Sequence, residues 1–176
     1  DEREARTLAG ELDRMNRERR AIEATIEEEA LADLDALAGS VQGRASVCVH
    51  RESWHQGVVG IVASRLKDRV HRPVIVFAPG GEGELRGSGR SIAGFHLRDA
   101  LDLVSKREPG SILRFGGHAY AAGLSLRARD FHRFAEAFEA VASEALTPDD
   151  LEQRCETDGE LARGELSIDL ARRLAG

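Results

Sequence analysis

The chain has 176 residues, a formal net charge of −6 and 41% hydrophobic residues, so it is long enough for one medium-sized domain with a buried core. No run approaches the roughly 20 apolar residues of a membrane span, and the first residues, DEREAR, lack the apolar segment of a signal peptide. Its two cysteines, Cys48 and Cys155, match neither disulfide nor metal-ligand spacing, so we expect a cytoplasmic protein with Cys48 as a reduced core thiol and no membrane partner.

Residues 2 to about 38 are expected to form one long helix that ends near Gly39. Its apolar residues recur at spacings of three and four, and these are Leu8, Leu12, Met15, Ile22 and Ile26. A helix of this length is typical of a coiled-coil partner or of a strut that joins two units, and its apolar stripe favours self-association. Because the sequence begins directly in this helix with no cap before it, we expect that the chain was cut from a longer protein.

The segment from about residue 41 to 146 is expected to alternate strands with helices. Strands are predicted at 45–50, 73–78, 84–92 and 123–128, and helices at 57–70, 96–104 and 130–146. PGGEG at 79–83 predicts a turn, and Asp130 is the expected N-cap of the last helix. This pattern predicts an α/β fold, a mixed sheet with flanking helices, preceded by the long connecting helix of residues 1–40.

Residues 147–176 interrupt that alternation. They predict one short strand, RCETDGELA, and one short helix, which is too little for an independent domain. We expect this segment either to begin another module or to pack back on the sheet.

Charge is distributed unevenly along these three segments. Residues 1–40 sum to −6 and residues 147–176 to −4, whereas residues 41–146 sum to +4. Of the 15 basic residues in the middle segment 13 are arginines, which can hold a phosphate with two parallel hydrogen bonds. Arginine enrichment also follows genome composition, so this pattern is only a weak indication of a nucleic-acid partner.

The stretch RFGGHAYAAGLSL at 114–126 carries the most unusual motif. Gly116 and Gly117 could expose successive backbone N–H groups as an anion-binding concavity, with His118 adding a side-chain donor. The small residues that follow would let a ligand lie close to the backbone. The alternative is a tight turn in which His118 bonds a local carbonyl, and spacing alone does not separate the two.

The stretch GSGRS at 87–91 places glycines inside a predicted strand. A period of two puts Arg86, Ser88 and Arg90 on one face and Gly87, Gly89 and Ser91 on the other. Glycine weakens a strand, so close approach of a phosphodiester backbone to this strand is one explanation. A twisted edge hairpin is the other.

The stretch SWHQGVVG at 53–60 joins a strand to a helix. His55 precedes the helix N-terminus, where anions are favoured; the alternative is a core Trp54 with His55 merely exposed. The remaining histidines show no metal-ligand spacing, and the chain has no nucleophile elbow and no phosphate-binding loop of the common types. The sequence therefore predicts neither a metal site nor a complete set of catalytic residues.

Four stretches in this order resemble one known family: WHQGVVGIVASRLKDRV, RPVIVFAP, GSGRSIAGFHLRDAL and RFGGHAYAAGLSL. They are similar to the DHH-associated domain of the RecJ family of single-stranded-DNA-specific exonucleases, in the DHH phosphoesterase superfamily. GGHxxAAG marks the superfamily, whereas the tryptophan-histidine segment and GRSI narrow it to this family. The resemblance covers about residues 1–146, and we expect it to extend over the rest.

The resemblance implies a parent enzyme that hydrolyses phosphodiester bonds in single-stranded DNA, 5′→3′, in DNA repair and recombination. Its partner would be a DHH domain that holds Mn²⁺ or Mg²⁺ and is joined through the long helix. This chain has no DHH triplet. We therefore expect no catalytic residue and no metal ligand in it, and it should bind single-stranded DNA weakly and cleave nothing.

The resemblance also implies where DNA would bind. By position, Gly116, Gly117 and His118 would contact the phosphate or nucleotide at the cleavage site, and Arg90 and Ser91 would contact the DNA backbone. Arg86 and His55 are added on geometry. Residues 147–176 look like the start of a truncated OB-fold-like module, similar to those that bind single strands by stacking and charge.

Two other functions remain open. One is a non-catalytic RNA-binding or interaction module, as in alanyl-tRNA synthetase, which competition between structured tRNA and a single-stranded oligonucleotide would distinguish. The other is half of a hydrolase for nanoRNA or cyclic dinucleotides. Residues 147–176 speak against the second, because such enzymes lack a following OB-fold segment.

Overall fold

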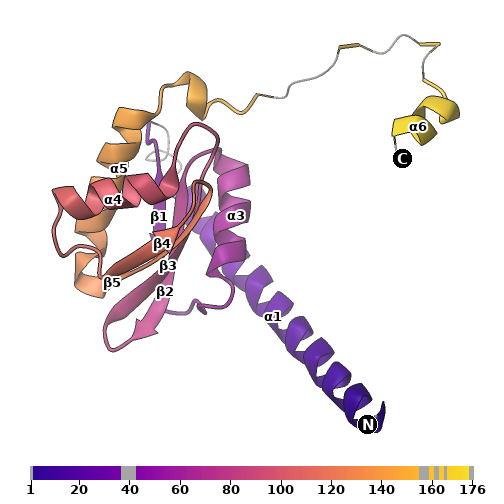
Figure 1. Cartoon of the computed structure of the whole chain (residues 1–176), viewed down its shortest axis with the longest axis horizontal. Helices are drawn as coiled ribbons and strands as arrows, with labels where there is room; N and C mark the ends of the chain where they lie inside the picture. Colours follow the sequence, from indigo (N-terminus) through magenta and orange to yellow (C-terminus); the bar gives the residue numbers. More distant parts are fainter. Residues whose placement is uncertain (1, 37–42, 155–158, 161–162, 165, 175–176) are drawn as a thin grey trace.

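A computed structural model of the chain describes residues 2–36, 43–154, 159–160, 163–164 and 166–174. Its body is a five-stranded mixed sheet in the order β1-β2-β3-β5-β4, with helices on both faces and a long N-terminal helix that projects away from it (Figure 1). The predicted α/β fold with a preceding long helix is confirmed.

The strands are β1 Val47–His50, β2 Val74–Gly81, β3 Glu84–Arg90, β4 Arg114–Gly117 and β5 Ala121–Arg127. The helices are α1 Glu2–Ala36, α3 Val59–Val70, α4 Leu97–Arg107, α5 Phe131–Ala145 and α6 Ile168–Leu174. β1 and β2 are parallel and joined through α3, whereas the other three pairs are antiparallel. β4 is consequently an edge strand, joined to β5 by a tight hairpin.

The hairpin between β2 and β3 is tighter than the sequence predicts. β2 continues through Pro79 to Gly81, and only Glu82 and Gly83 lie between the strands, with φ of 50° and 76°. Positive φ at both central residues matches the right-handed twist of a two-residue hairpin. The predicted turn at 79–83 therefore shrinks to two residues.

The start of α5 also differs from the prediction. Asp130 ends a 3-10 turn, Ala128–Asp130, and its side chain makes no capping hydrogen bond. Its φ and ψ of −92° and −1° are not the extended values that a capping residue needs. Asp130 does occupy the predicted N-cap position, but its carboxylate lies 3.6 Å from the Arg133 guanidinium and does not cap the helix.

One face of the sheet is covered by α4 and α5. Side chains of β2, β3 and β5 form a continuous hydrophobic cluster with these two helices. Phe77 and Phe138 pack against Phe134, the first edge to face and the second stacked. This layer is the larger part of the core.

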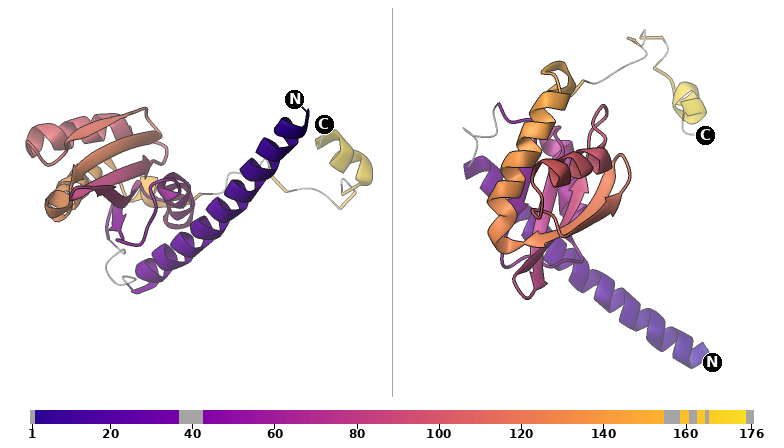
Figure 2. Two further views of the ribbon diagram at one scale, coloured as in Figure 1. Left: turned by 90° about the horizontal axis from the view of Figure 1, so that it is seen from below. Right: turned by 60° about the vertical axis from the view of Figure 1, so that its left-hand side comes forward.

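The other face is covered only in part. α3 packs its apolar residues on β1 and β2, with the C-terminal part of α1 outside it (Figure 2). Trp54 is 3% exposed and belongs to this cluster, so its interpretation as a core residue is confirmed. The strands β3, β5 and β4 contribute no side chain to this second cluster.

Glu139 of α5 anchors the start of β1. Its carboxylate accepts hydrogen bonds from the Ala45 N–H at 2.8 Å, the Ser46 N–H at 2.9 Å and the Ser46 hydroxyl at 2.6 Å. Two residues further on, the free thiol of Cys48 packs against the core cluster. Burial, and next the Glu139 charge, raise the pKa of that thiol far above its ordinary value, which is the behaviour of an inert core cysteine.

The two terminal helices are largely exposed over the residues whose side chains the structure describes. α1 buries Glu23 and Ile26 against the domain, whereas Leu8, Leu12 and Met15 face solvent. No described helix is both long and apolar enough to cross a membrane. The predicted C-terminal helix is present as α6, with no buried residue, and the predicted short strand at 154–162 falls largely outside the described residues.

Candidate nucleic-acid interface

The strands β5 and β4, with the adjoining part of β3, present a sheet face that α4 and α5 do not cover and that α3 covers only along β3. Their pairing aligns side chains of this face in three rows, which together we call the open face. The first row is Arg90, Ala121 and His118, the second Ser88, Gly123 and Gly116, and the third Arg86, Ser125 and Arg114. Alternate residues, such as Leu124 and Leu126, point to the core on the other side. α3 borders the open face along β3, where a Cβ on Gly60 would lie 3.2 Å from the Ser88 hydroxyl.

Small residues form the floor of the open face. Gly116 and Gly123 are exposed, a Cβ on Gly116 would meet no atom within 4 Å, and one on Gly123 would meet only a backbone oxygen at 3.9 Å. Ala121 adds only a methyl group. A ligand can therefore approach the main chain of β4 and β5 directly.

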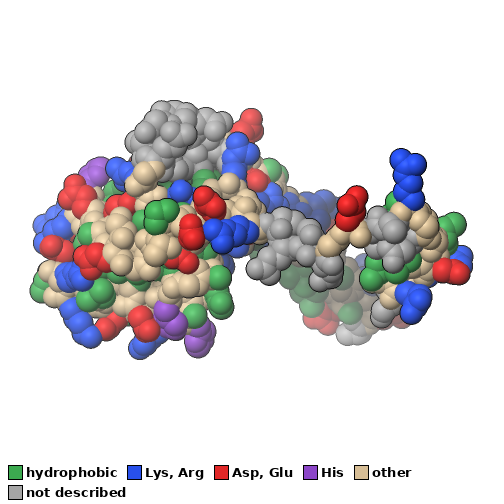
Figure 3. All heavy atoms as spheres, turned by 90° about the horizontal axis from the view of Figure 1, so that it is seen from above, with side chains coloured by type: hydrophobic (Ala, Val, Ile, Leu, Met, Phe, Trp, Pro, Cys, Tyr) green, Lys and Arg blue, Asp and Glu red, His purple; other side chains and the backbone are tan. Residues whose placement is uncertain are grey.

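Basic side chains surround this floor. Arg86, Arg114 and His118 are exposed, and Arg90 is half-buried. No Asp or Glu belongs to the three rows. Figure 3 shows one side of the chain, on which acidic and basic side chains are mixed. The open face is thus suited to an anionic ligand that lies close to backbone.

His118 is held at the end of β4 on a fixed hairpin. Its N–H donates to the Ala121 carbonyl at 2.8 Å, and its side chain is exposed. The connecting residues Ala119 and Tyr120 offer their carbonyls to the N–H groups of Leu97 and Ser91, at 2.8 and 3.0 Å. Because the turn is bonded to the loop before α4, the imidazole is presented from a rigid support.

The GGH segment forms the second predicted arrangement, a tight turn, with the main-chain N–H of His118 as the donor to the local Ala121 carbonyl. Gly116 and Gly117 complete strand β4, and the His118 N–H is used by the hairpin, so no concavity of successive free N–H groups forms. Gly117 has a φ of 150°, and a Cβ there would lie 2.4 Å from the Ala121 carbonyl oxygen. Packing of the hairpin thus requires Gly117, whereas nothing in the fold requires Gly116.

The glycines of β3 serve the core. A Cβ on Gly87 would lie 2.5 Å from the Phe77 ring, and one on Gly89 would lie 2.8 Å from Leu97. These glycines leave room for large side chains on the α4 side, so close approach of a ligand does not explain them. The predicted alternation nevertheless holds, because Arg86, Ser88 and Arg90 share the opposite face.

Arg90 and Ser91 have different surroundings. The Arg90 guanidinium donates to the Ser88 hydroxyl at 3.1 Å and to the Gly89 carbonyl at 2.8 Å, and its Nη2 lies beside Gly60 of α3. Ser91 is 5% exposed, and its hydroxyl donates to the Phe95 carbonyl at 2.7 Å. Ser91 therefore holds the loop that supports the His118 hairpin, and its hydroxyl is not available on the surface.

His55 lies away from the three rows. It is exposed, and its Nδ1 accepts a hydrogen bond from the Gly57 N–H at 3.1 Å. It lines a shallow hollow with Leu12 and Met15 of α1. The structure thus places His55 beside the long helix instead of beside His118.

Three residues of this region were not among those predicted from the sequence. Arg114 and Ser125 complete the third row, and Tyr120, 62% exposed, stands at the tip of the His118 hairpin. A period of two read backwards from His118 would have found Arg114. Ser125 could be found only from the order of the strands, which brings β3, β5 and β4 together.

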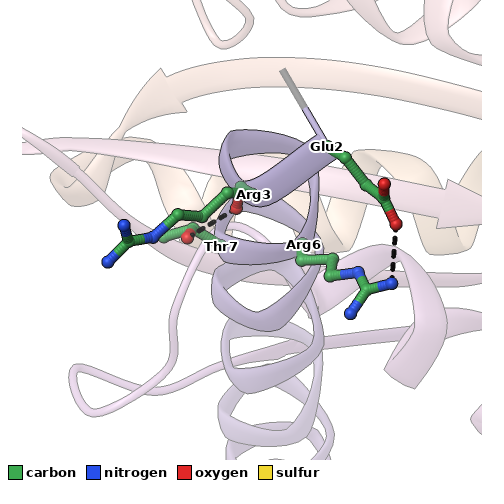
Figure 4. Close-up of a pocket in the computed structure, with 4 residues that line it drawn as sticks. All are labelled: Glu2, Arg3, Arg6 and Thr7. Carbon is green, nitrogen blue, oxygen red and sulfur yellow. Dashed lines mark hydrogen bonds and ion pairs between the residues drawn. The ribbon is translucent and has the colours of Figure 1, made fainter.

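Other features do not form a site. The described residues hold no group of three or more His, Cys, Asp or Glu side chains that could bind a metal ion. A hollow on the first turns of α1 is lined by exposed side chains only, with an ion pair of 2.6 Å between Arg6 and Glu2 (Figure 4). The open face is therefore the candidate site.

Comparison with known proteins adds a family to this geometry. The model of the DHHA1 domain family matches residues 43–144. The single-stranded-DNA-specific exonuclease RecJ of Dickeya dadantii is 49% identical over 97% of this chain, and RecJ of Escherichia coli is 46% identical over the same share. The chain spans 30% of the length of each.

A solved structure agrees with the sequence comparison. The crystal structure of RecJ in complex with Mn²⁺ from Thermus thermophilus has a TM-score of 0.76 and 30% sequence identity. The alignment covers 99% of this chain and 24% of that one. A RecJ crystal structure bound to manganese has a TM-score of 0.70 at 31% identity and covers 85% of this chain and 34% of that one.

Proposed function

Since the chain belongs to the DHHA1 domain family and its near relatives are RecJ exonucleases, we propose that it is the DNA-contacting part of a RecJ-like 5′→3′ exonuclease. The parent enzyme would degrade single-stranded DNA in repair and recombination, in the cytoplasm. Its other essential part would be a DHH domain, to which α1 connects.

The open face is the observation that carries this proposal. A single strand laid over Gly116 and Gly123 would bring its phosphates to the guanidiniums of Arg86, Arg90 and Arg114. Contacts to phosphates fix the position of a strand but carry no sequence information. An exonuclease that must advance along any sequence needs contacts of this kind.

His118 is the residue we assign to the cleavage site. Its exposed imidazole can donate a hydrogen bond to a phosphate oxygen, and such a donor stabilises the charge that grows there during hydrolysis. The metal ions of a DHH domain would supply the activated water. The described residues offer no cluster of ligands for such ions, so we assign no hydrolytic step to this chain.

Binding of a labelled oligothymidylate at low salt tests the proposal. We expect weak binding, no cleavage with Mn²⁺, and weaker binding of oligonucleotides of every sequence after Arg90→Ala. Arg98→Ala, which removes an exposed arginine of α4 on the covered face, is the matched control and should leave binding unchanged. Absence of any binding, or Mn²⁺-dependent cleavage by the purified chain, would contradict the proposal.

The same binding measurement distinguishes single-stranded-DNA binding from the remaining alternative, an RNA-binding module. Structured tRNA added as a competitor should displace the oligothymidylate poorly if the chain contacts single-stranded DNA. If tRNA competes much better than unlabelled oligothymidylate, the chain is an RNA-binding module of the kind found in alanyl-tRNA synthetase, and the DNA proposal fails.

We propose in addition that this chain, when isolated, pairs with a second copy through α1. Leu8, Leu12 and Met15 are each more than half exposed and lie along one stripe of the helix. An exposed apolar stripe at this spacing favours helix pairing. Sedimentation should show a concentration-dependent dimer that Leu12→Glu abolishes, whereas a monomer at every concentration would overturn this part.

A further inference from the structure

We infer that Arg86, Ser125 and Arg114 form a second phosphate subsite on the open face, separate from the one at His118. This inference rests on the proposed function, because it concerns the same strand of DNA. It adds a site at the opposite end of the face.

Ser125 is the central member of this subsite. Only 6% of the residue is exposed, and its hydroxyl oxygen is buried with no hydrogen-bond partner. Its neighbours Leu124 and Leu126 belong to the core, so the alternation of β5 turns Ser125 toward the open face. Buried polar groups almost always have a partner, and this hydroxyl has its hydrogen-bonding capacity available for a ligand on the open face.

Two arginines flank that hydroxyl. Arg86 pairs with Ser125 across β3 and β5, and Arg114 pairs with it across β4 and β5. Both side chains are exposed, and neither guanidinium has an ion pair or hydrogen bond within the part of the chain that the structure describes. By contrast, Arg107 of α4 holds both oxygens of Glu144.

An uncommitted hydroxyl between two uncommitted guanidiniums has the donors that a phosphodiester requires. Guanidiniums bind phosphate oxygens through pairs of N–H groups, and a serine hydroxyl adds a third direction. The long arginine side chains can move apart to admit a phosphate oxygen to Ser125. The nearest carboxylate along this face of β3 is Glu84 in the next row, where its pairing partner is Arg127.

The register sets the distance between the two subsites. Ser125 lies four residues along β5 from Ala121, the partner of His118 and Arg90, which is about 13 Å at roughly 3.3 Å per residue. About four stacked nucleotides span that distance, and fewer do so in an extended strand. A dinucleotide at His118 should therefore not reach Ser125, whereas a strand of five or more nucleotides should occupy both subsites.

Length dependence of binding tests the inference. Labelled oligothymidylates of two to eight nucleotides would be titrated against the 176-residue chain and its variants. For the unchanged chain we expect affinity to rise in a step once the strand is long enough to reach Ser125. Arg114→Ala and Arg86→Ala should each lower the affinity for long strands roughly tenfold. Neither should change the affinity for a dinucleotide.

Ser125→Ala should lower the affinity for long strands by a smaller factor, about threefold. Ser125→Thr should bind long strands as the unchanged chain does, because the hydroxyl is retained. Arg98→Ala is the control, and circular dichroism of each variant checks that the sheet is intact. If the chain binds long strands but its affinity shows no step with strand length, the second subsite is contradicted and the proposed function stands. The same holds if the variants weaken dinucleotide binding and long-strand binding equally. If no strand binds at any length, the proposed function falls with it.

Discussion

The two adjacent glycines of β4 differ in what a methyl group would meet. In Gly117→Ala the new Cβ would lie 2.4 Å from a backbone oxygen of β5, at a φ that L side chains rarely adopt, so we expect a loss of roughly 2–4 kcal/mol in the free energy of unfolding. Gly116→Ala meets open space and should leave stability unchanged or raise it by up to about 1 kcal/mol. Urea unfolding of both variants measures the difference.

The same pair tests the open face. Gly116→Ala should weaken binding of an oligothymidylate because its methyl group occupies the space over which the strand would lie. Equal stability and equal DNA affinity for Gly116→Ala and the unchanged chain would mean that the ligand does not approach this backbone.

His118 should matter for cleavage and not for folding. In the enzyme with its DHH domain attached, we expect His118→Ala to lower the rate of Mn²⁺-dependent degradation of single-stranded DNA by about 10²–10³-fold, the usual cost of losing one donor to a developing charge. Its exposed ring contributes little to packing, so the melting temperature should not change. His132→Ala, an exposed histidine of α5, is the matched control. Unfolding of the His118 variant would give the residue a structural role.

Individual site residues were predictable to the extent that strand alternation reveals them. The period of two correctly placed Arg86, Ser88 and Arg90 together. It could not show that the His118 N–H bonds to β5, nor that Ser91 donates to the Phe95 carbonyl, because both bonds depend on segments that meet only in the folded sheet.

At the scale of elements, α1 is attached through Ile26, which packs in the cluster with α3, and through ion pairs with α3. Arg65 contacts Glu27 and lies 3.3 Å from Glu23, whose side chain is only 8% exposed and also faces Arg19 at 3.6 Å. Arg65→Ala would leave a buried carboxylate with one distant partner, which should cost about 1–3 kcal/mol of local stability. Hydrogen exchange at α1 amides near Glu23 should accelerate while exchange in the sheet does not.

An exposed ion pair on α1 serves as the control for the hydrogen-exchange result of Arg65→Ala. Arg14 and Glu18 are 3.0 Å apart, with both side chains more than half exposed. Arg14→Ala should therefore change the local opening free energy measured by hydrogen exchange by no more than about 0.5 kcal/mol. If both variants behave alike, the buried position of Glu23 adds nothing to the attachment of α1.

Elements themselves were largely predictable, since apolar periodicity identified the long helix and three helices of the domain. Their ends were not. β2 extends to Gly81 because Glu82 and Gly83 adopt left-handed conformations, and the helical backbone of Asp130 prevents the capping geometry expected of an aspartate. Both outcomes depend on local backbone angles that residue type does not fix.

For the molecule as a whole, charge indicates how DNA should bind. The chain carries a net charge of −6, yet its middle segment holds 13 arginines. Many of these neutralise neighbouring acids, as Arg65 and Arg107 do, whereas the open face presents Arg86, Arg90 and Arg114 with no carboxylate in its rows. We therefore expect a phosphate backbone to contact this face and not the basic segment in general.

The salt dependence of DNA binding distinguishes binding through the open face from binding through the basic segment in general. Each phosphate neutralised on a single strand contributes about −0.7 to the slope of log K against log salt, so three arginines give a slope of roughly −2. Participation of all 13 arginines would give a slope on the order of −9. Fluorescence titrations between low and moderate salt measure the slope, and Arg114→Ala should make it shallower by about 0.7. A steep slope that Arg114→Ala does not alter would mean that DNA binds to basic residues elsewhere. The open face would then not be the DNA-binding site.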